Sequence, residues 1–596
     1  MSVRRWIAAA LLCFAVPCAW SNQSLKILRI AFPIAEDGFD PARINDNYSH
    51  SVVIHICESL YTYDYLAIPA QIRPLTAAAM PEHSPDYRTW TIRLRPGIYF
   101  TPDPAFKGQR RELVAADYVY SFKRFADPAT NSPQWADFEE LKIRGLESLR
   151  KAALDGKRPF DYDREIEGLR ALDRYTLQFQ LESPRPRLEH KLVSGFKGAV
   201  AREVVEAHGG RIMEHPVGTG PFKLGPWRRS SFIVLERNPD YREVHFDAQP
   251  APGDATGLAI AARLRGRRLP MVDRVEISII TENQPRWLTF VDGRIDTIEV
   301  PSDFLRLAMP GGKLAPYLER RGIQGHIVVS HAVSYIYFNM EDPIVGGYTP
   351  EKVALRRAVG LGMNIERSIA LARGGQGLVA QSAMAAHARG FDSGFRSENG
   401  EYDVARAKAL LDTYGYLDRN GDGWRELPNG QPLVLEYSTD PSQISRQMDE
   451  LFQKDMQAIG LKVAFKVAQW QENAKASRAG KLMMWQLGTF ILAPDGTDSL
   501  IRFYGPAAGG NNQSRFKLPA MDALYEKISV MPDGPERDAL FDQAKRLVIA
   551  YMPEKTTVHR VFSYMSQPWV VGYRIKPFIP GWYQMVDIDS SLAPPR

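Results

Sequence analysis

Apolar and polar residues alternate along several short segments in the first half of the chain. Between residues 89 and 100, Trp90, Ile92 and Leu94 fall on one face, and the residues between them are polar or charged. A period of two is typical of a β-strand that is buried on one side. Apolar or alternating runs of similar length, each followed by a turn signal, predict further strands at residues 27–33, 174–184 and 231–241.

The period changes to that of a helix in other segments, most often in the second half. One helix is predicted to begin at Thr349 as N-cap, with Pro350 in its first turn, and to stop at Gly374. Another is predicted to begin after Asp403. A helix at 115–127 and strands at 432–437 and 460–468 add to the mixture. Strands and helices without a fixed repeat predict an α/β architecture.

The chain has 596 residues, which is more than a single hydrophobic core usually supports, so two or three folding units are expected. Charged residues make up 24% of it, and 75 Lys and Arg are interleaved with 69 Asp and Glu. Because no basic block stands out, a nucleic-acid arm is not indicated. The apolar run near the N-terminus is too short to predict a membrane span, and no later segment has 18 consecutive apolar residues.

The first 21 residues resemble a secretory signal. Two arginines precede an apolar run of ten residues at 7–16, and Ala19 and Ser21 form a small-residue cleavage site. We therefore expect a signal peptide at 1–21 and a periplasmic mature protein. Alternatives are a lipoprotein cut before Cys18 and export in the folded state through the twin arginines.

The segment LDRNGDGWRELPNG at 417–430 resembles the start of a calcium loop. Asp418, Asn420 and Asp422 alternate before Gly423, but position 12 of the loop is Asn429 where a bidentate Glu is needed. A strand is predicted after it instead of a second helix. We interpret the loop as a helix-to-strand connection with Asx-type turns. An incidental structural calcium ion is the alternative.

Few residues suggest catalysis. Cys57 is the only cysteine after the signal and has apolar neighbours, which favours a buried residue over a nucleophile. The closest histidine pairs are five residues apart, which does not place two metal ligands on one helix face. Two S-x-x-K patterns begin at Ser148 and Ser514 and keep a periplasmic acyl-transfer hydrolase as an alternative, although its companion motifs are absent. We expect a binding protein with no catalytic residues, no cofactor and no metal.

Several motifs together resemble the extracellular solute-binding proteins of peptide-type ABC importers, known as family 5. The strongest is G-T-G-P-F followed by N-P-D-Y at 218–241. An Asp-Pro followed by E-S-L-Y lies at 39–64, and D-G-D-G-like residues follow a helix at 407–426. Further segments similar to the family are 86–124, 290–300, 336–369 and 511–527.

The resemblance implies an α/β, two-lobed periplasmic-binding-protein fold, class II-like, with an extra domain inserted in the first lobe and a cleft closed by hinge motion. Lobe 1 is expected to be discontinuous and lobe 2 continuous. The expected ranges are 22–57, 193–300 and 563–596 for lobe 1, 58–192 for the extra domain, and 301–562 for lobe 2. The implied partners are a peptide or small-molecule ligand and an ABC permease with its ATPase, and the implied state is a monomer.

Oligopeptide binders of the family hold the peptide α-ammonium with the Asp of a W-x-A-D-Y motif. In the corresponding stretch of this chain, the ungapped Asp position is Leu492 and the Trp position is Thr489. The solute could therefore be a peptide, an N-blocked or modified peptide, or a non-peptide such as an opine, an oligosaccharide or a metal complex. By the resemblance, the expected ligand-binding residues are Asp46, Asn47, Tyr48, Ser49, Trp485, Asp495, Asp498 and Arg502.

Overall fold

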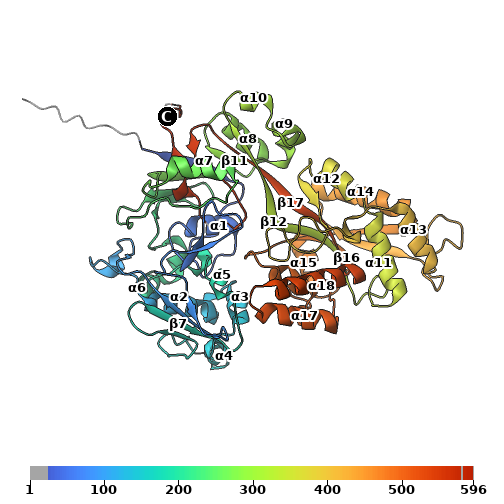
Figure 1. Ribbon diagram of the computed structural model, residues 1–596, viewed down its shortest axis with the longest axis horizontal. Helices are drawn as coiled ribbons and strands as arrows, with labels where there is room; N and C mark the ends of the chain where they lie inside the picture. Colours follow the sequence, from blue (N-terminus) through green and yellow to red (C-terminus); the bar gives the residue numbers. More distant parts are fainter. Residues whose placement is uncertain (1–24, 157, 579–580, 595–596) are drawn as a thin grey trace, which may run out of the picture.

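The computed structural model describes residues 25–156, 158–578 and 581–594. Two bodies face each other across a gap in Figure 1, and the long strands β12 (Gln324–Phe338) and β17 (Glu554–Ser566) run from the top centre into the body on the right. The predicted signal peptide at 1–21 lies outside the described residues. None of the helices in the described part of the chain is both long and apolar enough to cross a membrane.

The left-hand body, called the N-terminal body below, contains two four-stranded sheets. The first has the order β1-β10-β9-β8, in which β1 and β10 are parallel and the other pairs are antiparallel. The second has the order β4-β5-β7-β6 and is antiparallel throughout. The strands are β1 (Ile27–Phe32), β10 (Arg274–Ile279), β9 (Phe232–Arg237), β8 (Phe222–Arg228), β4 (Glu82–His83), β5 (Thr89–Arg93), β7 (Thr176–Gln180) and β6 (Leu169–Ala171).

Helices cover these sheets on sides where apolar residues recur. The alternation predicted for β5 is confirmed, because Trp90, Ile92 and Leu94 are all buried in one core. α2 packs on the same core and begins at the predicted residue. The helices of this body include α1 (Asn47–Val53), α2 (Ala115–Ala126), α3 (Trp135–Glu140), α4 (Leu146–Gly156), α5 (Leu188–Lys191), α6 (Arg202–His208), α7 (Ala255–Leu264) and α8 (Asn283–Val291). The hairpins β2 (Tyr61–Tyr63) with β3 (Ile72–Pro74) and β18 (Val570–Val571) with β19 (Asp587–Ile588) also belong to it.

The third sheet links the two bodies. Its order is β11-β17-β12-β16-β14-β15, with β13 pairing to β17. β17 pairs with β11 at one end and with β12 along nearly its whole length, so one pair of strands belongs to both bodies. The remaining strands are β11 (Thr297–Glu299), β13 (Gly377–Val379), β14 (Val434–Thr439), β15 (Lys462–Val467) and β16 (Met484–Phe490).

The right-hand body is called the C-terminal body below. Its helices pack around the third sheet. They are α11 (Pro350–Gly362), α12 (Ile365–Ala372), α13 (Val404–Thr413), α14 (Gln443–Ala458), α15 (Trp470–Arg478), α16 (Thr497–Leu500), α17 (Pro519–Val530) and α18 (Pro535–Tyr551). Two short helices, α9 (Leu305–Ala308) and α10 (Pro316–Glu319), lie near β11 instead. The mixed α/β prediction is therefore confirmed.

The single helix predicted from Thr349 to Gly374 is wrong, because the structure divides it into α11 and α12. α11 ends at Gly362, and Met363 adopts an extended conformation. The side chain of Asn364 then accepts a hydrogen bond from the Arg367 amide and starts α12. A side-chain oxygen at the N-cap satisfies an amide that would otherwise lack a partner. The apolar repeat continues through the break and hides it.

The calcium-like loop at 417–430 connects α13 to β14. It is therefore a helix-to-strand connection, as the sequence predicted. Its carboxylates accept backbone hydrogen bonds in Asx-type turns, for example Asp418 from the Gly421 amide at 2.7 Å and the Gly423 amide at 2.9 Å. Asp418, Asp422 and Glu426 also bring oxygens within 4.8 Å of one another. The calcium alternative stays a prediction.

Candidate binding cleft

A large cavity lies where the long strands pass between the bodies. It has a volume of about 550 Å³ and is lined by the end of β1, α1, β11, β12, β17, Phe490 of β16, and the C-terminal residues 573–577 and 582–583. Small-molecule sites usually enclose 300–1,000 Å³, so the size suits a short peptide or a comparable solute. Its aromatic lining includes Phe32, Tyr48, Phe490, Phe562, Tyr564 and Trp582.

Strand alternation explains which residues of β17 face this cavity. Arg560, Phe562 and Tyr564 line it, whereas Ser563 and Met565 are buried on the other side of the strand. Successive side chains of a strand point to opposite faces, so every second residue faces the cavity. The linking strand thus supplies a charged group and two aromatic rings to the floor of the cavity.

A second cavity of about 390 Å³ shares Phe490 with the first. One of its walls carries Asp137, Glu140 and Lys191 from the N-terminal body, and the opposite wall carries Leu492 and Asp498 from the C-terminal body. Lys191 pairs with Asp137 at 3.0 Å. We call the two cavities together the cleft.

The first group of predicted binding residues surrounds the start of α1. Asn47 and Tyr48 line the larger cavity. Asp46 caps the helix, accepting hydrogen bonds from the Tyr48 and Ser49 amides at 2.9 and 2.7 Å. Ser49 is buried and accepts a hydrogen bond from the Asp37 amide at 2.8 Å. Neither Asp46 nor Ser49 lines either cavity, so ligand contact at these two stays a prediction.

The second group lies in the C-terminal body. Asp498 and Arg502 line the smaller cavity, and Arg502 forms a buried ion pair with Glu554 at 3.0 Å. Trp485 lines neither cavity. It is buried on β16, with its ring 6.2 Å from that of Trp470. A role of Trp485 in ligand binding stays a prediction.

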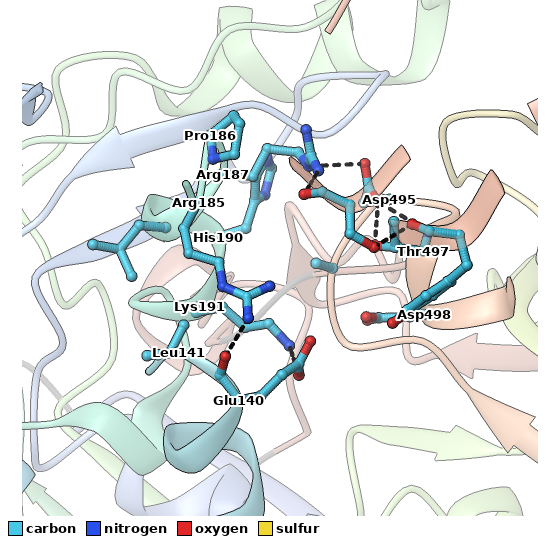
Figure 2. Close-up of a pocket in the computed structure, with 14 residues that line it drawn as sticks. Glu140, Leu141, Arg185, Pro186, Arg187, His190, Lys191, Asp495, Thr497 and Asp498 are labelled. Atoms are coloured by element: carbon cyan, nitrogen blue, oxygen red, sulfur yellow. Dashed lines mark hydrogen bonds and ion pairs between the residues drawn. The ribbon is translucent and has the colours of Figure 1, made fainter. Parts of the chain in front are cut away.

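Asp495 lies at a contact between the two bodies. Figure 2 shows it facing Arg187, which immediately precedes α5. The Asp495 carboxylate is 3.2 Å from Arg187 Nε and 2.6 Å from Nη1 of Arg537 in α18. Burial alone would raise the pKa of Asp495, but the hydrogen bonds from Arg537 and the charge of Arg187 outweigh it and hold the pKa well below its usual range. We call Arg187, Asp495 and Arg537 the rim network.

Two apolar side chains of the C-terminal body are exposed in the cleft. Leu492, at the expected ammonium-binding position, has 69% of its surface accessible, and Phe490 has 45%. Both contribute to the lining of the smaller cavity. Beside this apolar surface, the Asp498 carboxylate accepts a hydrogen bond from the Leu492 amide at 3.3 Å.

Titratable groups of the larger cavity are shifted by their surroundings. Burial lowers the pKa of His331 to about 4, so this ring is neutral at physiological pH. Burial and the charge of Arg574 lower the pKa of Lys576 to about 8, although Asp64 and Asp254 act in the opposite direction. Burial by the cavity walls raises the pKa of Glu299 and lowers that of Arg560. Sequence reasoning missed Glu299 and Arg560, although the alternation H-R-V-F-S-Y-M around Arg560 carried a signal for the second.

The groups considered for catalysis are arranged differently from an active site. The Ser514 hydroxyl donates to Asn512 Oδ1 at 3.0 Å, while Lys517 Nζ pairs with Glu341 at 2.6 Å. Cys57 is fully buried, and burial raises the pKa of its thiol to about 12. Neither Ser514 with Lys517 nor Cys57 therefore provides an activated nucleophile next to a base.

The deeply buried His55 leads to a pH prediction. The centre of its ring lies 4.1 Å from that of the Tyr583 ring, and burial lowers its pKa to about 3. The unfolded chain therefore binds the proton first as the pH falls below about 6.5, which favours unfolding. We expect the free energy of unfolding of the wild type to fall by up to about 3 kcal/mol more than that of His55→Gln between pH 6.5 and 4, measured by urea unfolding. His245→Gln, at an exposed histidine, should keep the wild-type slope; an unchanged slope in His55→Gln would contradict the prediction.

The family described as bacterial extracellular solute-binding proteins, family 5 Middle, matches residues 71–511. The chain belongs to this family. The predicted resemblance is thus confirmed, and the family is one of non-catalytic solute-binding proteins.

Individual relatives agree with the family over nearly their whole length. The family 5 chain is 25% identical to the di/tripeptide-binding protein 2 of Pseudomonas aeruginosa, over 97% of this chain and 98% of that protein. It is 23% identical to the heme-binding protein A of Haemophilus influenzae, over 93% and 90% of the two chains. The periplasmic binding protein DppA from Helicobacter pylori, solved in complex with the peptide STSA, superposes with a TM-score of 0.69 at 21% identity, over 94% and 98%. The fold prediction is confirmed by this superposition.

Proposed function

We propose that this chain is the periplasmic substrate-binding component of an ABC importer. It binds a peptide or peptide-like solute in the cleft and delivers it to a membrane permease and its ATPase. The observation that carries the proposal is the cavity of about 550 Å³ built on the two strands that both bodies share. Motion of one body about these strands changes the walls of the cleft together, so a solute that touches both walls favours the closed form.

The proposal includes a division of the mature chain into lobes. Lobe 1 takes residues 22–57, 193–300 and 563–596, the extra domain takes 58–192, and lobe 2 takes 301–562. The sheets support this division, since β1, β8, β9 and β10 form one sheet and β4 to β7 form another. Export through a signal peptide at 1–21 and a monomeric state in the periplasm complete the proposal.

The apolar lining of the smaller cavity favours a second class of solute. Leu492 and Phe490 expose apolar surface where oligopeptide binders of the family carry an ammonium-binding Asp. An apolar solute that bears a carboxylate, as heme does, fits these contacts as well as a peptide with a blocked N-terminus. This candidate keeps the importer role and changes only the cargo.

Native mass spectrometry of protein prepared gently from the periplasm tests the proposal. We expect a mass above that of the mature chain and, after denaturation, short peptides identified by sequencing. Ligand present at 100 times its Kd stabilises the folded state by about 2.7 kcal/mol, so added solute that binds should also raise the melting temperature. Phe562→Ala, which removes a ring of the cavity floor, should lower the occupied fraction, whereas Tyr402→Ala, at an exposed tyrosine outside the cleft, should not.

A single non-peptide mass would overturn the peptide cargo and retain the binding role. Protein that carries no solute, and that no solute of either class stabilises against heat, would overturn the binding role itself.

A further inference from the structure

Arg560 is a cation of the cleft without a protein counter-ion. Its Nε donates to Ser334 Oγ at 3.0 Å, and no carboxylate of the described residues lies within ion-pair distance of its guanidinium. Its Nη atoms donate no hydrogen bond to any described residue and face the larger cavity. A half-buried guanidinium in this state is less stable than one that is paired.

Three arginines that are 4% exposed or less show how this protein compensates such a charge. Arg502 pairs with Glu554 at 3.0 Å, and Arg537 pairs with Asp495 at 2.6 Å. Arg356 donates to the carbonyl of Val345 at 2.7 Å and to further backbone carbonyls. Arg560 differs from all three because its unsatisfied side is open to the place where a solute lies.

The surroundings of Arg560 hold its fork in place and add positive charge. Its guanidinium carbon lies 5.9 Å from the centre of the Phe490 ring. A side chain on Gly488 would overlap Arg560 Nη2, so the glycine keeps this position open. Arg373 is close enough to influence Arg560 electrostatically, and Lys576 and the neutral His331 line the same cavity. Glu299 is the one carboxylate among the residues that line this cavity. It lies on β11 opposite Tyr564 of β17. Because Tyr564 is four residues from Arg560 along the strand, the two charged residues are about 13 Å apart.

We propose that Arg560 binds a carboxylate of the transported solute, so that the cleft selects solutes with an acidic end. The inference rests on the proposed function and specifies its substrate class. Five N–H groups in a planar fork match a carboxylate in a bidentate manner, and the partly desolvated site strengthens the pair. The carboxylate is the C-terminus of a peptide or the acidic group of a non-peptide solute such as heme.

Titration calorimetry on protein freed of ligand by unfolding and refolding tests the inference. The probes are one set of di- to tetrapeptides with free C-termini, the same set amidated, hemin, and hemin dimethyl ester. For whichever class binds, we expect the wild type to prefer the free acid by at least about thirtyfold, because a lost partner of a buried charge pair weakens binding by that order. Arg560→Gln should abolish this preference. Arg306→Gln, at an exposed arginine that lines neither cavity, should retain it.

The outcomes separate the two proposals. Acid preference for peptides that disappears in Arg560→Gln supports both, and acid preference for hemin alone supports the inference while overturning the peptide cargo. Equal binding of acid and neutral forms by the wild type, or a preference that survives in Arg560→Gln, overturns the inference.

A ligand-independent measurement decides the case in which no probe binds. In ligand-free protein, Arg560→Gln removes an uncompensated charge, so we expect an equal or higher melting temperature than that of the wild type. Arg356→Gln, at an arginine satisfied by backbone carbonyls, should lower it. A fall in Arg560→Gln as large as that in Arg356→Gln would show that Arg560 supports the fold and would overturn the inference.

Discussion

Replacing Glu58 by Gln should lower the free energy of unfolding by about 3 kcal/mol or more. The Glu58 carboxylate is 2% exposed and receives both Nη groups of Arg242, at 2.6 and 2.9 Å. It also accepts hydrogen bonds from Thr219 Oγ1 at 2.9 Å and from the Tyr241 hydroxyl at 3.1 Å. Without the negative charge, Arg242 remains as a mostly buried cation that nothing neutralises. Urea unfolding of the ligand-free protein measures the change.

The expected loss depends on burial, which a matched variant tests. Glu167 also pairs with an arginine, Arg144, at 2.8 Å, but both side chains are well exposed. Surface pairs contribute about 0–1 kcal/mol, so Glu167→Gln should have a small effect. Adding Arg242→Met to Glu58→Gln removes the stranded charge and should restore part of the stability. A Glu58→Gln variant as stable as Glu167→Gln would contradict the argument.

The same carboxylate explains why motifs far apart in the sequence resemble the family together. Glu58 belongs to E-S-L-Y, Thr219 to G-T-G-P-F, and Tyr241 to N-P-D-Y, followed by Arg242. The three segments meet at one buried group. Sequence reasoning had no means to identify Glu58 as the partner of the G-T-G-P turn, because nothing local links residue 58 to residue 219.

Local patterns predicted the local elements well. The alternation around Trp90 and the cap at Asp403 depend on residues a few positions apart, and β5 and α13 occur where they were expected. The break at Asn364 was missed because its signal is a single capping side chain within a continuing apolar repeat. Patterns of burial therefore predict an element more reliably than its interruption.

The cleft could be predicted only in part. Tyr48 was identified because the resemblance points to the segment after the first strand, and the structure places it in the cavity. Glu299 and Arg560 are 261 positions apart and share that cavity because β11, which carries Glu299, pairs with β17, which carries Arg560. Since the pairing is set by tertiary contacts, the sequence alone did not bring these two charges together.

Replacing Asp495 by Asn should lower the free energy of unfolding by about 3–5 kcal/mol at neutral pH. Asp495 is 5% exposed and neutralises Arg537, which is fully buried, as well as Arg187. Its pKa in the folded state lies below that of the unfolded chain, so its contribution is complete above about pH 4 and is lost as the pH falls below that value. The difference in stability between wild type and Asp495→Asn should therefore shrink in urea titrations below about pH 4. A difference that stays constant with pH would contradict the assignment to this carboxylate.

Arg187→Met separates the contact between the bodies from the stability of the C-terminal body. Arg187 belongs to the N-terminal body and donates to the Ser529 carbonyl at 3.0 Å as well as pairing with Asp495, whereas the Asp495–Arg537 pair lies within the C-terminal body. Removing Arg187 should cost less stability than Asp495→Asn, because the inner pair survives, and it should widen the cleft. We expect a larger radius of gyration in small-angle X-ray scattering and weaker solute binding, since part of the binding energy must then close the cleft. Arg306→Met, at an exposed arginine away from the rim network, should change neither quantity. An Arg187→Met protein with the wild-type radius and affinity would show that the rim network stabilises the C-terminal body without favouring the closed form.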